Sequence, residues 1–67
     1  MINVIVNGRA QAFDGAMSLP DLIERLEITH PRIAVALNGE VLRREEHPAT
    51  IIRDGDSVEI VRMVGGG

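Results

Sequence analysis

Apolar and polar residues alternate in several short stretches of this chain, a pattern that predicts β-strands. The first stretch, Ile2-Asn3-Val4-Ile5-Val6, is also rich in β-branched side chains. Asn7-Gly8 and Asn38-Gly39 each follow such a stretch, and Asn-Gly readily takes the positive φ angles of a tight hairpin turn. The strands that we expect are residues 2–6, 9–13, 33–37, 41–42 and 58–63.

One segment has the spacing of a helix. Ser18 is a favourable N-cap, and Asp21 three residues later resembles the acidic half of a capping box. Pro20 fits the first turn, where its missing N–H is not needed. The apolar residues that then share one helix face are Leu19, Leu22, Ile23 and Leu26. Pro31 prevents the helix from running further.

The order of elements is strand, strand, helix, strand, short strand, strand. One helix can cover only one face of one sheet, so we expect a two-layer α+β domain. The most economical arrangement places the N- and C-terminal strands side by side and parallel at the sheet centre. This is the β-grasp (ubiquitin-like) architecture, a mixed four- to five-stranded sheet with one helix on one face. Residues 1–64 would form the domain, and residues 65–67 would form a flexible tail. Within the domain, residues 43–53 are interpreted as an irregular stretch with a short 3₁₀ turn.

Strand alternation also assigns the two faces of the sheet. The core positions are Ile2, Val4, Val6, Ile33, Val35, Leu37, Val58 and Ile60, joined by Leu22, Ile23 and Leu26 of the helix. The opposite face carries Ile5, Ala34, Ala36, Val61 and Met63, which are apolar where a solvated sheet face is usually polar.

Contiguous exposed apolar patches are typical of partner-binding sites, so we expect a docking face here, extended by Arg62 and Val64 beside the tail. Arg62 would anchor an acidic partner loop, or it is an ordinary solvated arginine. Tolerated exposed aliphatics and self-association are the alternatives for the face as a whole.

Composition excludes several functions. The chain has 67 residues, 45% of them hydrophobic, no Cys, and a net charge of −3. The acidic balance argues against nucleic acid, which favours basic patches. No apolar run approaches the roughly 20 residues of a membrane span, and residues 1–3 lack the features of a signal peptide, so the cytoplasm is the expected location.

The side chains offer few candidates for covalent chemistry, catalysis or metal binding. All seven basic residues are Arg, so no side chain can receive an isopeptide bond or form a Schiff base. His30 and His47 lack ligand-type spacing, and Glu45-Glu46 is interpreted as a solvated pair. We therefore expect no metal site and no catalytic residue.

The chain ends in Gly65-Gly66-Gly67. Glycine reaches conformations closed to other residues, so three in a row after a strand form a narrow extension that can enter a tight channel. A frayed terminus is the plain alternative.

Taken together, these pieces resemble the ThiS family of sulfur carrier proteins in thiamine biosynthesis. The pieces that match are the strand ending in Asn7-Gly8, the Asp14-Gly15 turn, Leu37-Asn38-Gly39-Glu40, Asp54-Gly55-Asp56 and the closing residues 58–67. The resemblance spans the whole chain.

The resemblance implies that an adenylating (E1-like) enzyme activates the Gly67 carboxylate with ATP and magnesium. A persulfide from a sulfurtransferase or cysteine desulfurase then gives a thiocarboxylate, and thiazole synthase receives the sulfur. The chain itself would have no active site and bind no cofactor. The alternatives are another β-grasp carrier or modifier (the small subunit of molybdopterin synthase, cysteine or tRNA thiolation, a ubiquitin-like conjugate) and a plain interaction module.

Overall fold

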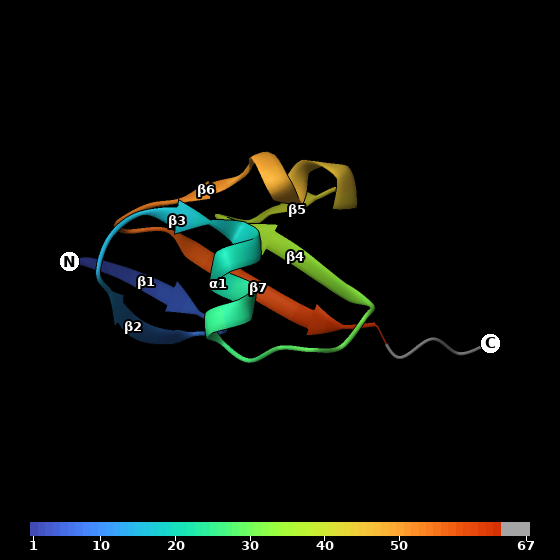
Figure 1. The fold of residues 1–67 in the computed structure, drawn as a ribbon, viewed down its shortest axis with the longest axis horizontal. Helices are drawn as coiled ribbons and strands as arrows, with labels where there is room; N and C mark the ends of the chain where they lie inside the picture. Colours follow the sequence, from blue (N-terminus) through green and yellow to red (C-terminus); the bar gives the residue numbers. More distant parts are fainter. Residues whose placement is uncertain (64–67) are drawn as a thin grey trace.

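The computed structural model describes residues 1–63, which form a mixed sheet with one helix across one face (Figure 1). In chain order the elements are β1 (Ile2–Val6), β2 (Arg9–Phe13), β3 (Met17–Ser18), α1 (Leu19–Arg25), β4 (Ile33–Leu37), β5 (Glu40–Leu42), the 3₁₀ helix η1 (Arg44–Ala49), β6 (Ile51–Ile52) and β7 (Ser57–Arg62). The predicted division into residues 1–64 and a tail of residues 65–67 therefore falls partly outside the described residues.

The main sheet has five strands in the order β2-β1-β7-β4-β5. The first and last strands of the chain, β1 and β7, lie side by side and parallel, with Ile5 paired to Ser57 and Val6 to Val58. The β1–β2, β4–β5 and β4–β7 pairs are antiparallel. This confirms the expected two-layer α+β architecture and the β-grasp strand arrangement.

Both predicted Asn-Gly hairpins are present. Asn7 and Gly8 have φ angles of 50° and 82°, and Asn38 and Gly39 have 51° and 84°. Positive φ at both central residues defines the type I′ turn, whose twist matches that of the flanking strands. The turns thus set the β1–β2 and β4–β5 registers.

The helix begins where the sequence predicts. The Ser18 hydroxyl oxygen accepts a hydrogen bond from the Asp21 backbone N–H at 3.2 Å, and Pro20 occupies the first turn. The N-terminal donors of the helix are the ones that lack intrahelical partners, so this cap stabilises the start.

The helix ends in a Schellman arrangement at Glu27. The Ile28 N–H donates to the Ile23 carbonyl at 3.2 Å, and the Glu27 N–H donates to the Glu24 carbonyl at 3.0 Å. Glu27 itself has a φ of 58°, a left-handed conformation in which a Cβ is strained. The chain turns here toward β4 well before Pro31.

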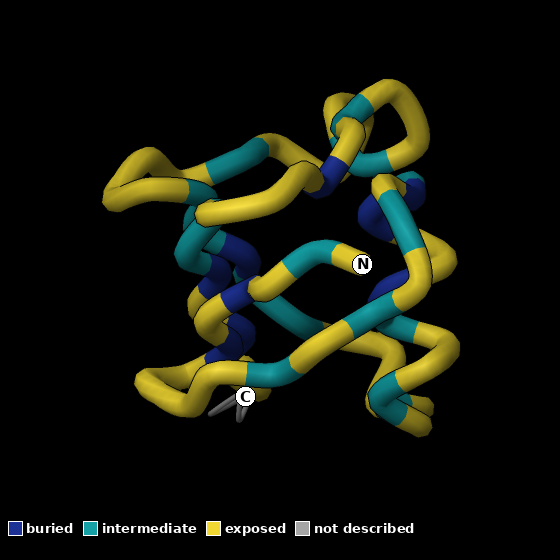
Figure 2. Tube along the Cα trace, turned by 90° about the vertical axis from the view of Figure 1, so that its left-hand side faces the viewer, coloured by how far each residue is buried: buried dark blue, intermediate teal, exposed yellow. Residues whose placement is uncertain are grey.

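The core lies between the sheet and α1, and Figure 2 shows buried positions alternating with exposed ones along β1, which follows the N label. Its buried residues are Val4, Val6, Met17, Leu19, Leu22, Val35, Ile52, Val58 and Ile60. The other predicted core residues pack against this cluster but are only partly buried: Ile2, Ile23, Leu26, Ile33 and Leu37.

Sequence reasoning missed a second, two-stranded sheet, in which Met17 pairs with Ile52 and Ser18 with Ile51. Residues 43–53 hold the predicted 3₁₀ turn as η1, but they also hold β6. A two-residue strand is too short for alternation to reveal it. The pair matters because Ile52 and Met17 close the core beside α1.

Candidate functional site

The sheet face turned away from α1 is the candidate site, and strand register places its residues. Ala34 pairs with Val61, and Ala36 pairs with Glu59 on one side and Val41 on the other. Side chains of paired residues lie on the same face of a sheet. The structure thus brings the predicted residues of β4 and β7 into adjacent rows, although they lie about 25 positions apart in sequence.

This face, hereafter the open face, exposes large apolar side chains. Ile5 is 43% exposed, Val61 58% and Met63 50%, and Val41 is 74% exposed at the sheet edge. The two alanines are half-buried. Monomeric proteins seldom expose contiguous apolar surface without a use for it, so this geometry suits the docking of a partner.

Several residues of the open face were not singled out from the sequence, among them Val41 and Glu59. Val41 and Glu59 both reach it through their pairing with Ala36. Alternation along β7 would have found Glu59, which lies between the buried Val58 and Ile60. Val41 belongs to a three-residue strand, where alternation alone assigns no face.

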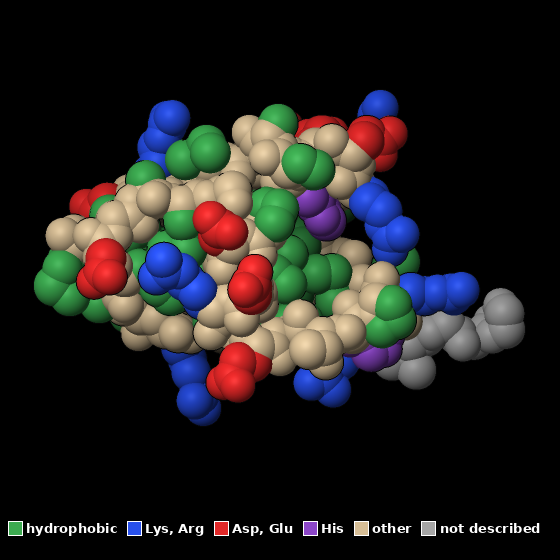
Figure 3. All heavy atoms as spheres, viewed as in Figure 1, with side chains coloured by type: hydrophobic (Ala, Val, Ile, Leu, Met, Phe, Trp, Pro, Cys, Tyr) green, Lys and Arg blue, Asp and Glu red, His purple; other side chains and the backbone are tan. Residues whose placement is uncertain are grey.

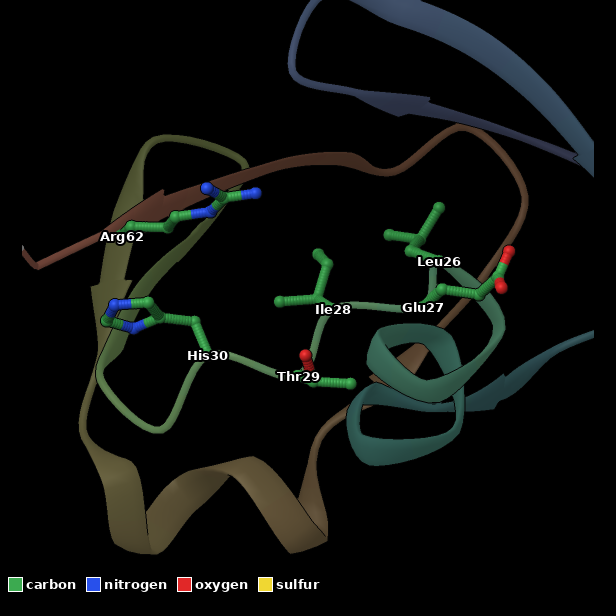
Figure 4. Close-up of a pocket in the computed structure, with 6 residues that line it drawn as sticks. All are labelled: Leu26, Glu27, Ile28, Thr29, His30 and Arg62. Atoms are coloured by element: carbon green, nitrogen blue, oxygen red, sulfur yellow. The ribbon is translucent and has the colours of Figure 1, made fainter.

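Arg62 lies on the other side of the sheet. It pairs with Ile33 and lines a surface cavity of about 280 Å³ together with Leu26, Glu27, Ile28, Thr29 and His30. In Figure 4 the Arg62 side chain extends from β7 toward Ile28 and Leu26, while the Glu27 carboxylate points away from them. Arg62 therefore does not extend the open face, and its expected role as an anchor remains a prediction.

The end of β7 is tied to the loop before β4. The Met63 N–H donates to the Arg32 carbonyl at 2.9 Å, and the His30 Nδ1 lies 2.8 Å from that same oxygen. Met63 is the last residue that the structure describes. These contacts hold the point from which residues 64–67 depart. The predicted site residues Val64, Gly65, Gly66 and Gly67 lie outside the described residues.

The helix-bearing face has a different character. Figure 3 shows acidic and basic side chains interspersed there with apolar ones.

Within residues 1–63 no group of three or more His, Cys, Asp or Glu side chains is placed to hold a metal ion. In the same part of the chain, no helix has the length and apolar character to cross a membrane.

Comparison with known proteins decides the family. The ThiS family model matches residues 4–67. The chain belongs to the ThiS family. The resemblance in sequence is thereby confirmed, and this ThiS-family chain is a small sulfur carrier protein of thiamine biosynthesis.

Individual relatives agree with this assignment. The crystal structure of the thiamine biosynthesis protein ThiS from Geobacter metallireducens is 39% identical with a TM-score of 0.87, over 98% of this chain and 100% of that one. The sulfur carrier protein ThiS of Thermus thermophilus is 34% identical over 64 residues, which are 96% of this chain and 98% of that protein.

A third relative is much longer. The thiazole synthase of Paramagnetospirillum magneticum is 29% identical over 66 residues, and the match covers 98% of this chain but only 20% of that protein's length.

Proposed function

We propose that the Gly67 carboxylate of this ThiS-family chain carries the sulfur atom, as a thiocarboxylate. The carboxylate is a poor acyl donor, so it must first be activated. A carboxylate oxygen attacks the α-phosphorus of ATP on an adenylating enzyme, with magnesium neutralising the phosphates, and pyrophosphate leaves. The product is an acyl-adenylate at Gly67.

Sulfur then replaces oxygen. The terminal sulfur of a persulfide, held by a sulfurtransferase or a cysteine desulfurase, attacks the acyl carbon and expels AMP. The product is an acyl disulfide that joins Gly67 to the partner enzyme. A partner thiol then attacks the sulfur atom that belongs to the enzyme, which releases the thiocarboxylate on Gly67 and leaves a disulfide on the partners. Thiazole synthase accepts the sulfur. We expect all of these partners in the cytoplasm, and the chain contributes no catalytic group to any step.

The observation that carries the proposal is the position of the open face relative to the end of β7. Val61 and Met63 lie on that face, β7 ends at Arg62, and residues 64–67 follow Met63 in the sequence. An enzyme that docks on the open face is therefore adjacent to the residues that it must modify. Side-chain chemistry supports the same reading, because the sequence contains neither Cys nor Lys.

Intact-mass spectrometry tests the proposal. The chain is incubated with the adenylating enzyme, ATP, magnesium and a sulfur donor, and the same measurement is made on protein isolated from its host. We expect the mass to rise by the difference between sulfur and oxygen, with fragmentation placing the change on Gly67. A chain that keeps its carboxylate under both conditions contradicts the proposal.

A further inference from the structure

The open face contains one carboxylate in an apolar setting. Glu59 is exposed on β7, with Ala36 beside it on β4 and Val61 two residues further along its own strand. Ile5 lies diagonally across on β1, because its parallel partner is Ser57. Within residues 1–63, Glu59 is the only charged strand residue on this face, since the strand arginines Arg9 and Arg62 pair with the core-side residues Val6 and Ile33.

The geometry of the chain end indicates that a partner covers this carboxylate. Four residues follow Met63 and span at most about 14 Å, so an enzyme that acts on Gly67 must come that close to Met63. A specific interface buries about 800 Å² on each partner, a patch roughly 30 Å across. Glu59 is four residues before Met63, about 13 Å along an extended strand. It therefore falls inside such a patch on the open face.

Covering Glu59 has an electrostatic consequence. A carboxylate that loses its water without a counter-charge is strongly destabilised, whereas a cation held opposite to it offsets the loss and selects the correct partner. Within residues 1–63 a second copy of this chain offers for that role only arginines outside its strands, because both strand arginines, Arg9 and Arg62, pair with core-side residues.

We propose that Glu59 is a specificity-determining residue that pairs with an arginine or lysine on the docking surface of the adenylating enzyme. This inference rests on the proposed function and specifies its partner. The enzyme surface that fits the open face is apolar, with one basic side chain positioned to meet Glu59 beside Ala36 and Val61. Glu59 positions the carrier and takes no part in the chemistry at Gly67.

Steady-state adenylation kinetics test the inference with the full chain and the adenylating enzyme of the same organism. We expect Glu59→Arg to raise the KM for the carrier by about 100-fold and Glu59→Gln by about tenfold, with kcat unchanged in both. The KM of the original chain should rise with ionic strength, whereas that of Glu59→Gln should respond much less, because the charge pair is screened by salt. If Glu59 served only in folding, its replacement would neither raise KM at constant kcat nor reduce the salt dependence of KM.

Glu40→Arg is the matched control. Glu40 is also an exposed strand glutamate, but it pairs with Leu37 on the helix side of the sheet, so its reversal changes net charge equally and leaves the open face intact. The inference is overturned if Glu59→Arg retains the original KM, or if Glu40→Arg raises KM as much. It is also overturned if ultracentrifugation shows a dimer that Met63→Asp dissociates. Failure of the original chain to be adenylated would instead contradict the proposed function, and this inference with it.

Discussion

The side-chain oxygen of Asn7 accepts a hydrogen bond from the backbone N–H of Ile60 at 2.7 Å, across 53 residues of sequence. Asn7 is also the first central residue of the β1–β2 turn. One residue therefore shapes a local hairpin and continues the β1–β7 contact beyond the end of β1, which makes it a sensitive point of the fold.

Asn7→Gly separates these two roles, because glycine keeps the positive φ but removes the acceptor. We expect it to lower the free energy of unfolding by about 1–2 kcal/mol, since the part-buried Ile60 N–H loses its partner. Asn7→Asp retains an acceptor oxygen and should remain close to the original chain. Urea denaturation measures both, and equal stabilities would show that the hydrogen bond contributes nothing.

Glu27→Gly should stabilise the chain. Glu27 has a φ of 58° at the end of α1, where glycine is the favoured residue because it lacks a Cβ. We expect the free energy of unfolding to rise by about 1 kcal/mol in chemical denaturation. Glu24→Gly, one turn earlier in the helix, is the control and should cost about 1 kcal/mol. A loss of stability in both variants would argue that Glu27 carries no strain.

Removing Gly66 and Gly67 should separate folding from function. The buried core lies between Val4 and Ile60, so we expect the denaturation midpoint to stay unchanged. The shortened chain should no longer be adenylated, because its carboxylate falls about 7 Å short of the reacting position. Pyrophosphate release measures the reaction. Adenylation of the truncated chain would refute the assignment to Gly67, and a truncated chain that fails to fold would reveal a structural role for the tail.

Met63→Asp tests whether the open face docks the adenylating enzyme. Met63 is half exposed, so the free energy of unfolding should hardly change. Binding, measured by calorimetry, should weaken at least tenfold, because the new carboxylate would be buried against an apolar partner surface.

Ile51→Asp is the control for this variant. Ile51 is another exposed apolar residue, 43% accessible, and it lies on β6 away from the open face. Its replacement should leave binding unchanged. Docking elsewhere would be indicated if Met63→Asp bound normally, or if Ile51→Asp weakened binding as strongly.

Local sequence patterns were sufficient for the features that depend on neighbouring residues. The Asn-Gly turns, the Ser18 cap, the alternation of burial along β1 and β7, and the two faces of β4 are all confirmed, since each follows from the preferences of a few consecutive residues. The element order and the single helix were then enough to limit the architecture to a two-layer α+β domain.

Tertiary structure alone decided which distant residues meet. The pairing of β3 with β6, the row formed by Val41, Ala36 and Glu59, and the bond from Ile60 to Asn7 join segments that carry no local signal of one another. Between strands that no hairpin joins, register is set by packing against the shared core, and a shift by one residue would turn each side chain to the other face. For this reason the sequence by itself identified an apolar face and a glycine end, whereas only the folded sheet placed Glu59 beside Ala36 in one row with Val41, and Arg62 beside Ile33 at the cavity formed with residues 26–30.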